Sequence, residues 1–356
     1  MGGTNPQVKS NVKKIVVLGS GNFGTCLAHH LAGQNHAVTL WTRDPHTEAS
    51  INEKHRNPRY LTGLDIHPAI RASTRSDGLF DDVDMILLAV PTQGLRQVLE
   101  LLADRIPEDP LIVCAVKGVE NNTLTFPLGI VTETLGATRG EQAVVLSGPS
   151  FAVEVVEGQP TAVSLASNSK GRCRQAQSIF HSPYFRAYTS EDPVGLEVAG
   201  ALKNVIAIAS GATVGMGYQR NSQAALLTRG LAEITRVGIA VGANPLTFTG
   251  LGGVGDLFLT CTSEKSRNYT VGYRLGQGEQ LGDIIRTVGS VAEGVTTAKA
   301  AWRLSRKLGV DAPIIGEVYR VLYEKKPIAE AVASLLTRDP KPEIQHGQKQ
   351  DQADPS

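Results

Sequence analysis

Short apolar runs alternate with helix-like segments through the first half of the chain. Such runs, bounded by polar or turn-forming residues, are typical of buried strands, and the segment 23–32 between the first two has the pattern of a helix. Strands that are apolar on both faces predict a mostly parallel sheet covered by helices on each side. The predicted strands are residues 15–18, 37–41, 85–90, 111–116, 143–146 and 161–166.

The pattern changes near residue 194. From there strand-like runs disappear, and segments rich in Ala, Leu, Ile and Gly follow helical spacing, as in 222–241 and 293–308. The second half is therefore predicted to be all-helical, with glycines that favour close helix packing. The chain is expected to divide into a flexible tail (1–12), an α/β domain (13–193), a helical domain (194–340) and a disordered tail (341–356).

Composition argues against two classes of protein. The 356 residues carry 35 basic and 34 acidic side chains, and this near-neutral balance speaks against nucleic-acid binding. The eight histidines show no metal-ligand spacing, so no metal site is expected. The four cysteines lie far apart without a C-x-x-C pair and are expected to be reduced and buried; they are Cys26, Cys114, Cys173 and Cys261.

The same sequence predicts a cytoplasmic, soluble protein without a membrane span. The first dozen residues are polar and lack the apolar core of a signal peptide. The most apolar later stretch, 198–214, is interrupted by Lys203, Asn204 and Ser210, and it is shorter than the roughly 20 residues that a span needs.

A glycine motif follows the first predicted strand directly. Gly19-Ser20-Gly21-Asn22-Phe23-Gly24 has the G-x-G-x-x-G spacing and opens the first predicted helix. In this context the glycines permit a tight turn, and the helix amino terminus can hold a pyrophosphate. The α/β domain is therefore predicted to be a Rossmann-type dinucleotide-binding domain; the alternative is an ordinary turn between a strand and a helix.

The end of the second predicted strand bears on the choice of dinucleotide. An NAD site usually places an acid about twenty residues after the glycines, where it holds the ribose hydroxyls. Here Arg43 lies at that position and Asp44 comes one residue later. Because an arginine can pair with a 2′-phosphate, NADP is favoured over NAD. The alternative is a solvated arginine in a loop.

Two lysines are candidates for acid–base chemistry. Lys117 follows the strand 111–116 and is expected at the carboxyl edge of the sheet, where ligands of open parallel sheets bind. Lys203 lies in a helix too apolar to be exposed, and burial lowers the pKa of a lysine. The alternatives are a solvated lysine at a loop start for Lys117 and a snorkelling lysine for Lys203.

Two further segments carry candidate polar groups. Residues 251–257 are expected to form a glycine-rich turn that delivers Asp256, with Thr260 shortly after it. Ser266 can cap a helix whose first turn holds Arg267 and Asn268, a suitable site for a phosphate. A capped surface helix is the alternative reading of the second segment.

Together these segments resemble the bacterial type of NAD(P)-dependent glycerol-3-phosphate dehydrogenases. The likeness spans residues 13 to 338, and its motifs occur in the same order along the chain. They are the segments 19–24, 41–45, 117–120, 147–152, 203–208, 229–233, 255–257, 260–262, 266–268 and 291–294.

The resemblance implies a role for each matching residue. Lys203 would be the general acid–base in the interconversion of dihydroxyacetone phosphate and sn-glycerol 3-phosphate, a product that would supply phospholipid synthesis. The other residues implied in catalysis are Lys117, Asp256 and Thr260. Those implied in substrate binding are Lys117, Gly148, Ser150, Lys203, Asp256, Ser266, Arg267 and Asn268. Those implied in binding NADP or NAD are Gly19, Gly21, Asn22, Phe23, Gly24, Arg43, Lys117, Ala152, Arg267, Val291 and Glu293.

The resemblance also implies a homodimer formed through the helical domain. Two alternatives to this function are a dehydrogenase of the same two-domain plan that acts on a hydroxy acid or a ketopantoate-like compound, and a non-catalytic NAD(P)H sensor. The first needs a carboxylate site rather than a phosphate site. The second needs no acid–base lysine beside an aspartate.

Overall fold

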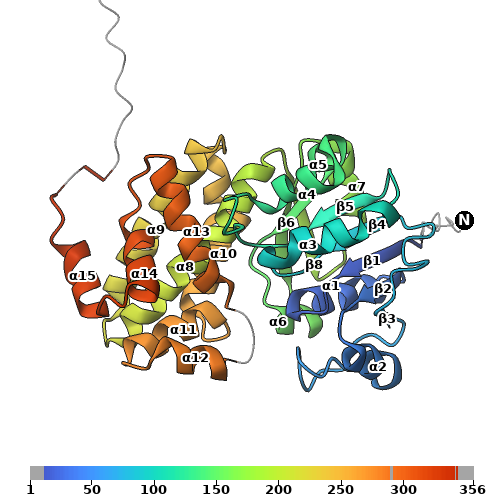
Figure 1. Ribbon diagram of the computed structural model, residues 1–356, viewed down its shortest axis with the longest axis horizontal. Coiled ribbons are helices and arrows are strands. Elements are labelled where there is room, and N and C mark those ends of the chain that lie inside the picture. The colour runs from blue at the N-terminus through green and yellow to red at the C-terminus, as the bar shows by residue number, and fades with distance from the viewer. Residues whose placement is uncertain (1–11, 289–291, 341, 344–356) are drawn as a thin grey trace, which may run out of the picture.

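The molecule consists of a sheet domain and a helical domain that lie side by side (Figure 1). The structure is a computed structural model that describes residues 12–288, 292–340 and 342–343. Both tails expected to be flexible fall outside this range except for Val12 and residues 342–343. The expected boundary at residue 193 coincides with the first residue of the long helix α8 (Pro193–Gly215).

One sheet of eight strands forms the centre of the first domain, in the order β3-β2-β1-β4-β5-β6-β7-β8. All neighbouring pairs are parallel except β6 and β7, which are antiparallel. The predicted mostly parallel sheet is thus confirmed. The strands are β1 (Lys14–Leu18), β2 (Ala37–Trp41), β3 (Arg71–Ser73), β4 (Met85–Leu88), β5 (Leu111–Cys114), β6 (Val144–Ser147), β7 (Thr161–Ala166) and β8 (Phe185–Ser190).

Helices cover both faces of this sheet because its inner strands are apolar on both faces. In β1, Ile15 and Val17 pack with the side chains of α1 and α7, whereas Val16 and Leu18 pack with those of α3 and α4. The helices of this domain are α1 (Asn22–Gly33), α2 (Pro45–Lys54), α3 (Thr92–Leu102), α4 (Pro127–Leu135), α5 (Ala137–Gln142), α6 (Ala152–Val156) and α7 (Lys170–Phe180), with a 3-10 turn at Ala103–Arg105.

The topology fixes where a ligand can bind. β1 pairs with β2 on one side and with β4 on the other, so the chain direction across the sheet reverses between β1 and β4. In open α/β sheets the crevice beyond the carboxyl ends of the strands at such a switch point is the usual ligand site. The glycine motif 19–24 begins at this point, directly after β1.

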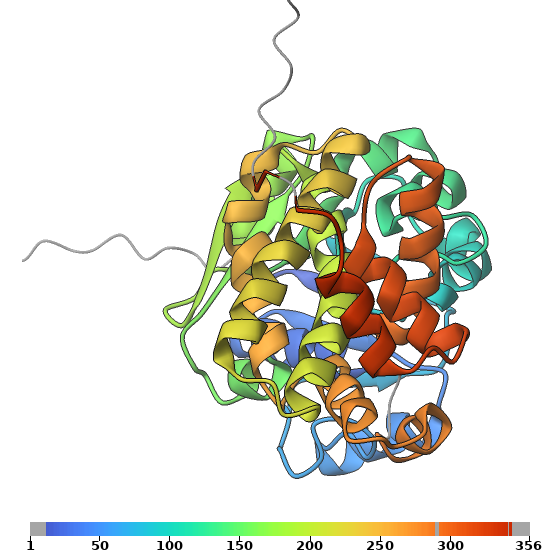
Figure 2. The same cartoon turned by 90° about the vertical axis from the view of Figure 1, so that its left-hand side faces the viewer.

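The second domain is all-helical, as predicted, and Figure 2 views the molecule from its side. Its helices are α8 (Pro193–Gly215), α9 (Arg220–Ala240), α10 (Asp256–Thr262), α11 (Arg267–Gly276), α12 (Leu281–Thr287), α13 (Glu293–Lys307), α14 (Pro313–Tyr323) and α15 (Ile328–Leu336), with a 3-10 turn at Pro245–Thr249 and a π-helical turn at Leu251–Gly255.

Helix α8 is the centre of this domain and also contacts the sheet. It packs against α9, α10, α11, α13 and α14, and it reaches β6 and β7 with its first turns. The close approach of α8 and α11 depends on glycine, as the composition predicted. A Cβ on Gly211 would lie 2.0 Å from the carbonyl oxygen of Tyr269, and one on Gly272 would lie 1.9 Å from that of Ile208.

Length alone would allow α8 to cross a membrane. The helix has 23 residues and is longer than the apolar stretch 198–214. The prediction that this part of the chain is too short to span a membrane is therefore wrong. Its apolar side chains are instead satisfied inside the protein, where 72% of its most apolar window is buried. A helix that is apolar all round is expected at the core of a large domain. All four cysteines are free and buried, as predicted.

Candidate active site

A cleft of about 370 Å³ lies between the two domains. The sheet domain contributes the start of α1 and the ends of β4 and β5, and the helical domain contributes α8, α10, α13 and the start of α11. Residues from both halves of the sequence therefore meet here. The predicted site residues that line the cleft are Gly21, Asn22, Phe23, Lys117, Ser150, Ala152, Lys203, Thr260, Ser266, Arg267, Asn268 and Glu293.

The glycine motif forms a cradle at the sheet side of the cleft. A Cβ on Gly24 would lie 2.0 Å from the carbonyl oxygen of Gly19, so the loop can close this tightly only with glycine. A Cβ on Gly21, in contrast, would meet no protein atom within 4 Å. Gly21 is the N-cap of α1 and provides no side-chain cap, which leaves the first backbone N–H groups available for an anion. The residues present thus fit a dinucleotide pyrophosphate.

The two candidates for the ribose end differ in their availability. Asp44 is the N-cap of α2, and its carboxylate accepts hydrogen bonds from the backbone N–H of His46 and the hydroxyl of Thr47. Arg43 is exposed at the end of β2. The carboxylate of Asp44 is therefore engaged as the cap of α2, whereas the side chain of Arg43 is exposed.

Two lysines at the floor of the cleft share one aspartate that lies behind them. The ammonium of Lys203 on α8 donates to Oδ1 of Asp256 at 2.6 Å and to the hydroxyl of Thr260 at 2.8 Å. The ammonium of Lys117 donates to the other carboxylate oxygen, Oδ2, at 2.8 Å. Asp256 is only 2% exposed, so it lies behind both lysines and does not line the cleft itself. One buried carboxylate thus holds two ammonium groups at the substrate end.

Burial and charge set the protonation of this group. Burial lowers the pKa of Lys203 to about 8; the repulsion of Lys117 acts in the same direction, and attraction by Asp256 opposes both. For Asp256, burial alone would raise the pKa, but the two lysines outweigh it and hold the pKa below its usual value. Lys203 is therefore a lysine that can both give and take a proton near neutral pH.

The segment that delivers Asp256 is helical, which corrects the expected glycine-rich turn. Leu251–Gly255 forms a π-helical turn that continues into α10, with non-helical backbone angles only at Gly253. Tertiary packing explains the difference, because Gly252 and Gly253 are buried. A Cβ on Gly252 would lie 2.0 Å from Leu196, and one on Gly253 would lie 2.2 Å from the carbonyl oxygen of Phe248.

The start of α11 forms the opposite wall of the cleft. Ser266 caps this helix, as predicted, by accepting a hydrogen bond from the backbone N–H of Tyr269. Asn268 is held from two sides: its amide donates to the side chain of Asn204, and its oxygen accepts from the backbone N–H of Gly294. Arg267 also lines the cleft. The amino terminus of α11 therefore lies at the cleft together with Arg267 and Asn268, and these are groups that can bind an anion.

Glu293 adds an acid to this wall. Burial raises its pKa to about 7, although Arg267, Lys117 and Lys203 attract its charged form. The Glu293 carboxyl group thus interacts electrostatically with both lysines of the site and with Arg267. Near neutral pH it is expected to exchange a proton readily.

Some predicted residues do not line the cleft. Gly19 and Gly24 lie behind the loop that they shape, Arg43 lies outside, and Gly148 packs against β7, where a Cβ would lie 2.9 Å from the Cα of Val163. Val291 falls outside the described residues. Sequence reasoning missed several lining residues, which are Tyr60, Pro91, Asn204 and Lys265. Only Asn204 had a signal, because it follows the buried Lys203.

Comparison with known proteins agrees with this geometry. The chain is 44% identical over 330 residues to a glycerol-3-phosphate dehydrogenase (NAD(P)+) of Limosilactobacillus reuteri (strain DSM 20016), which covers 92% of this chain and 98% of that protein. It is 47% identical over 330 residues to the protein of the same name from Leptospira biflexa, with 93% and 99% covered. The crystal structure of glycerol-3-phosphate dehydrogenase from Coxiella burnetii superposes with a TM-score of 0.87 at 33% identity, covering 92% and 99%.

The family itself is identified from both halves of the chain. Residues 14–173 match the family described as NAD-dependent glycerol-3-phosphate dehydrogenase N-terminus, and residues 192–333 match the corresponding C-terminus. These matches confirm the resemblance found in the ordered motifs. The chain belongs to the family of NAD-dependent glycerol-3-phosphate dehydrogenases.

Proposed function

We propose that this protein, as an oxidoreductase of this family, interconverts dihydroxyacetone phosphate and sn-glycerol 3-phosphate with NAD(P)(H). The observation that carries the proposal is the buried ammonium of Lys203, held by Asp256 in a cleft that also contains the start of α11. An acid–base group and an anion site in one cleft suit a phosphorylated ketone. A 2-keto acid would also need an acid–base group, but with a carboxylate site in place of the phosphate site.

Lys203 acts as the general acid–base. The nicotinamide, when bound, supplies the hydride in reduction and accepts it in oxidation. In reduction, the Lys203 ammonium donates a proton to the oxygen of the substrate carbonyl; in oxidation, the neutral amine takes that proton from the alcohol. Asp256 and Thr260 orient the amine through the contacts described above. Lys117 keeps a second positive charge beside the forming alkoxide.

The phosphate of the substrate binds at the start of α11. The backbone N–H groups of the first turn and the side chains of Ser266, Arg267 and Asn268 are the donors at this end of the cleft. Ser150 lies at the cleft and is placed to contact the substrate. Gly148 contributes through the backbone of the segment that precedes Ser150.

The cofactor binds along the glycine cradle with its pyrophosphate at α1. Gly19, Gly21 and Gly24 shape the loop, and the cleft residues that contact the cofactor are Asn22, Phe23, Lys117, Ala152, Arg267 and Glu293. We favour NADP over NAD because Arg43 is exposed at the end of β2 while Asp44 is occupied as the cap of α2.

The enzyme is further proposed to act in the cytoplasm as a homodimer and to supply glycerol phosphate for phospholipid synthesis. Exposed apolar side chains of the helical domain are suited to a contact between subunits; they are Leu246 (73% exposed), Val254 (41%) and Phe258 (62%). Light scattering tests this contact. A dimeric mass that Phe258→Asp converts to a monomeric mass would support it, and a monomeric native protein would refute it.

The reaction is tested by following NADPH and NADH oxidation with dihydroxyacetone phosphate, in the native protein and in Lys203→Ala. We expect oxidation by the native protein that the substitution abolishes while NADPH binding survives. A native protein that binds NADPH but oxidises it only with a 2-keto acid, or with no ketone at all, would refute the substrate assignment.

A further inference from the structure

The segment between β5 and α4 carries one of the two lysines of the site. This segment, residues 117–126 and here called the Lys117 loop, begins at the floor of the cleft and then runs between the two domains. Val119 is fully buried against Ala201 of α8 and Ala300 of α13. The backbone oxygen of Asn121 accepts a hydrogen bond from Arg303 of α13 at 2.7 Å. The loop therefore touches α8, α10 and α13, three of the elements that frame this end of the cleft.

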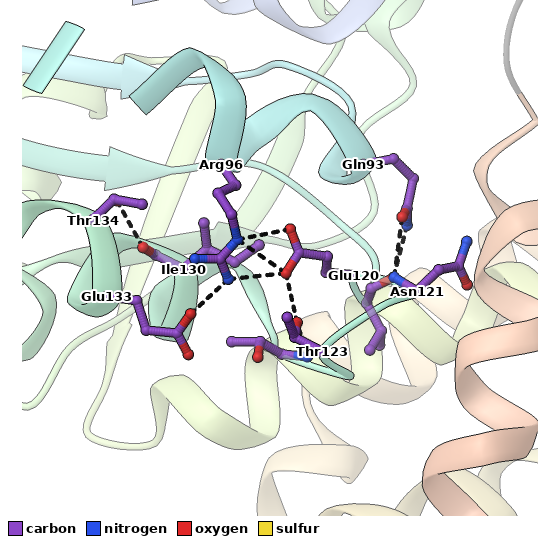
Figure 3. A network of polar contacts seen from close by, with 10 residues as sticks. Gln93, Arg96, Glu120, Asn121, Thr123, Ile130, Glu133 and Thr134 are labelled. Atoms are coloured by element: carbon purple, nitrogen blue, oxygen red, sulfur yellow. Dashed lines mark hydrogen bonds and ion pairs between the residues drawn. The ribbon is translucent and has the colours of Figure 1, made fainter. Parts of the chain in front are cut away.

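An ion pair fixes this loop to the sheet domain (Figure 3). Arg96 of α3 donates from Nε to both carboxylate oxygens of Glu120, at 3.1 and 3.2 Å, and from an Nη to one of them at 2.9 Å. The hydroxyl of Thr123 donates to the same carboxylate. The side chains of Arg96 and Glu120 are only 24% and 10% exposed. A forked contact with little exposure resists solvent screening better than an ordinary surface pair.

A second side chain of α3 holds the residues on either side of Glu120. The amide of Gln93 donates to the backbone oxygen of Val119 at 2.8 Å, and its oxygen accepts from the backbone N–H of Asn121 at 3.0 Å. Figure 3 shows Gln93 and Arg96 reaching the loop from the same helix. Three consecutive loop residues are thus tied to α3, immediately beyond the turn at Gly118.

Only Gly118 separates Lys117 from the loop residues that Gln93 and Arg96 hold, and its backbone has little freedom to move. Gly118 has a φ of +156°, and a Cβ there would lie 2.5 Å from the hydroxyl of Thr92, the first residue of α3. The turn is therefore pressed against the helix that carries Arg96. Neither Arg96 nor Glu120 lines the cleft. Any effect of these two residues on the reaction must pass through the loop.

We propose that Arg96 and Glu120 are positioning residues for the reaction, and that their ion pair holds the Lys117 loop so that the Lys117 ammonium stays on Asp256. The proposal rests on the function proposed above, in which Lys117 supplies charge beside the reacting oxygen. When the ion pair is broken, Gln93 and the buried Val119 still retain the loop in the fold. The segment next to Lys117 is then held less tightly, so that Lys117 moves relative to Asp256 and the reaction slows.

The test compares Arg96→Met and Glu120→Gln with a control in the same network. Glu133 of α4 also accepts from Arg96, at 2.5 Å, but it lies outside the loop and is half-exposed. We expect kcat for dihydroxyacetone phosphate reduction to fall about tenfold or more in both loop variants, because small misplacements of reacting groups are costly. The dissociation constant of NADPH should change less than kcat, because Lys117 is one of several proposed cofactor contacts. The Tm should fall in both loop variants, since each leaves a largely buried charge without its partner, but the loss of kcat should not follow the Tm. Glu133→Gln should keep native kcat.

A conservative exchange separates positioning from general loss of structure. Arg96→Lys keeps the charge but not the forked contact, so it should recover part of the kcat that Arg96→Met loses. Native kcat in Arg96→Met and Glu120→Gln would overturn the proposal. A loss of kcat that follows the Tm across all four variants would overturn it as well. If the native protein does not reduce dihydroxyacetone phosphate, the proposed function fails instead, and Lys203→Ala reports that separately.

Discussion

Lys203 and Asp256 form a buried ion pair, 2.6 Å between Nζ and Oδ1, from positions on two helices of the same domain. The same carboxylate also binds Lys117 from the other domain. Removing one partner of a buried pair leaves an uncompensated charge, so such groups depend on one another. The pKa of Lys203 therefore depends on its burial, on Asp256 of its own domain and on Lys117 of the other domain.

The pH dependence of the reaction should follow from this arrangement. Lys203 has a pKa of about 8, and in the proposed mechanism reduction requires its protonated form. We expect kcat/KM for dihydroxyacetone phosphate reduction to decrease as the pH rises through about 8. The same constant for glycerol 3-phosphate oxidation should increase over that range, since oxidation requires the neutral amine. Rate profiles in both directions measure this; two profiles that bend the same way would contradict it.

The glycine cradle predicts different effects for two alanine substitutions. Gly21→Ala adds a Cβ that meets no protein atom within 4 Å, so the Tm should be unchanged. The added methyl would meet the pyrophosphate, and the NADPH dissociation constant should rise about tenfold or more. Gly24→Ala places a Cβ 2.0 Å from the Gly19 carbonyl oxygen and should lower the Tm as well. Thermal melts and NADPH titrations distinguish them; unimpaired NADPH binding by Gly21→Ala would place the cofactor elsewhere.

Cofactor preference should depend on Arg43. Arg43→Ala removes the guanidinium proposed to pair with the 2′-phosphate, so the dissociation constant of NADPH should rise about tenfold while that of NADH changes little. Arg71→Ala is a matched control, because Arg71 is exposed at the opposite end of the neighbouring strand β3. Equal effects of Arg43→Ala on both cofactors would argue against the preference for NADP.

A buried acid at the start of α8 should make stability depend on pH. Burial raises the pKa of Glu197 to about 8, and its carboxyl oxygen accepts a hydrogen bond from the backbone N–H of Leu128 at 2.8 Å. The folded state holds this proton more tightly than the unfolded chain. The stabilising contribution is complete at a pH below the ordinary value of 4.5 and is lost as the pH rises towards about 8.

Glu197→Gln keeps the acceptor and removes the titration. The free energy of unfolding of Glu197→Gln should exceed that of the native protein by an amount that grows as the pH rises. At the alkaline end the difference should be a few kcal/mol, as expected from the difference between the folded and unfolded pKa of Glu197. Denaturant unfolding at mildly acidic pH and at about pH 8 measures the difference. Glu197→Ala loses the acceptor and should be less stable than Glu197→Gln at every pH. A constant difference between Glu197→Gln and the native protein would show that Glu197 does not titrate on unfolding.

The sequence predicted best the parts of the fold that local patterns determine. β2 and β7 have the predicted bounds because polar residues limit both apolar runs. β8 was not predicted, because it is an edge strand in which Arg186 and Tyr188 are exposed. Its sequence contains too many polar residues to resemble the apolar runs of the inner strands. β3 has only three residues, which no periodicity can identify.

The contacts within the site could be predicted from the sequence less well than its residues. Motifs identified Lys117, Lys203 and Asp256 as members of one site, but the sharing of a single carboxylate joins positions 139 and 53 residues apart. No spacing rule connects such positions, because the fold alone brings them together. The sequence did not predict the ion pair of Arg96 and Glu120 either. No spacing rule joins these positions, and neither residue lines the cleft.

The central place of α8 also affects how the chain must be made. During synthesis α8 is complete at Gly215, whereas the helices that cover it, α9, α10, α11, α13 and α14, follow along the chain as far as Tyr323. Until they emerge from the ribosome, a 23-residue apolar helix has no partner except the sheet that its first turns touch. Exposed apolar surface of this kind promotes aggregation of nascent chains. The helix that carries Lys203 thus keeps its apolar surface uncovered until the later helices of its domain have been made.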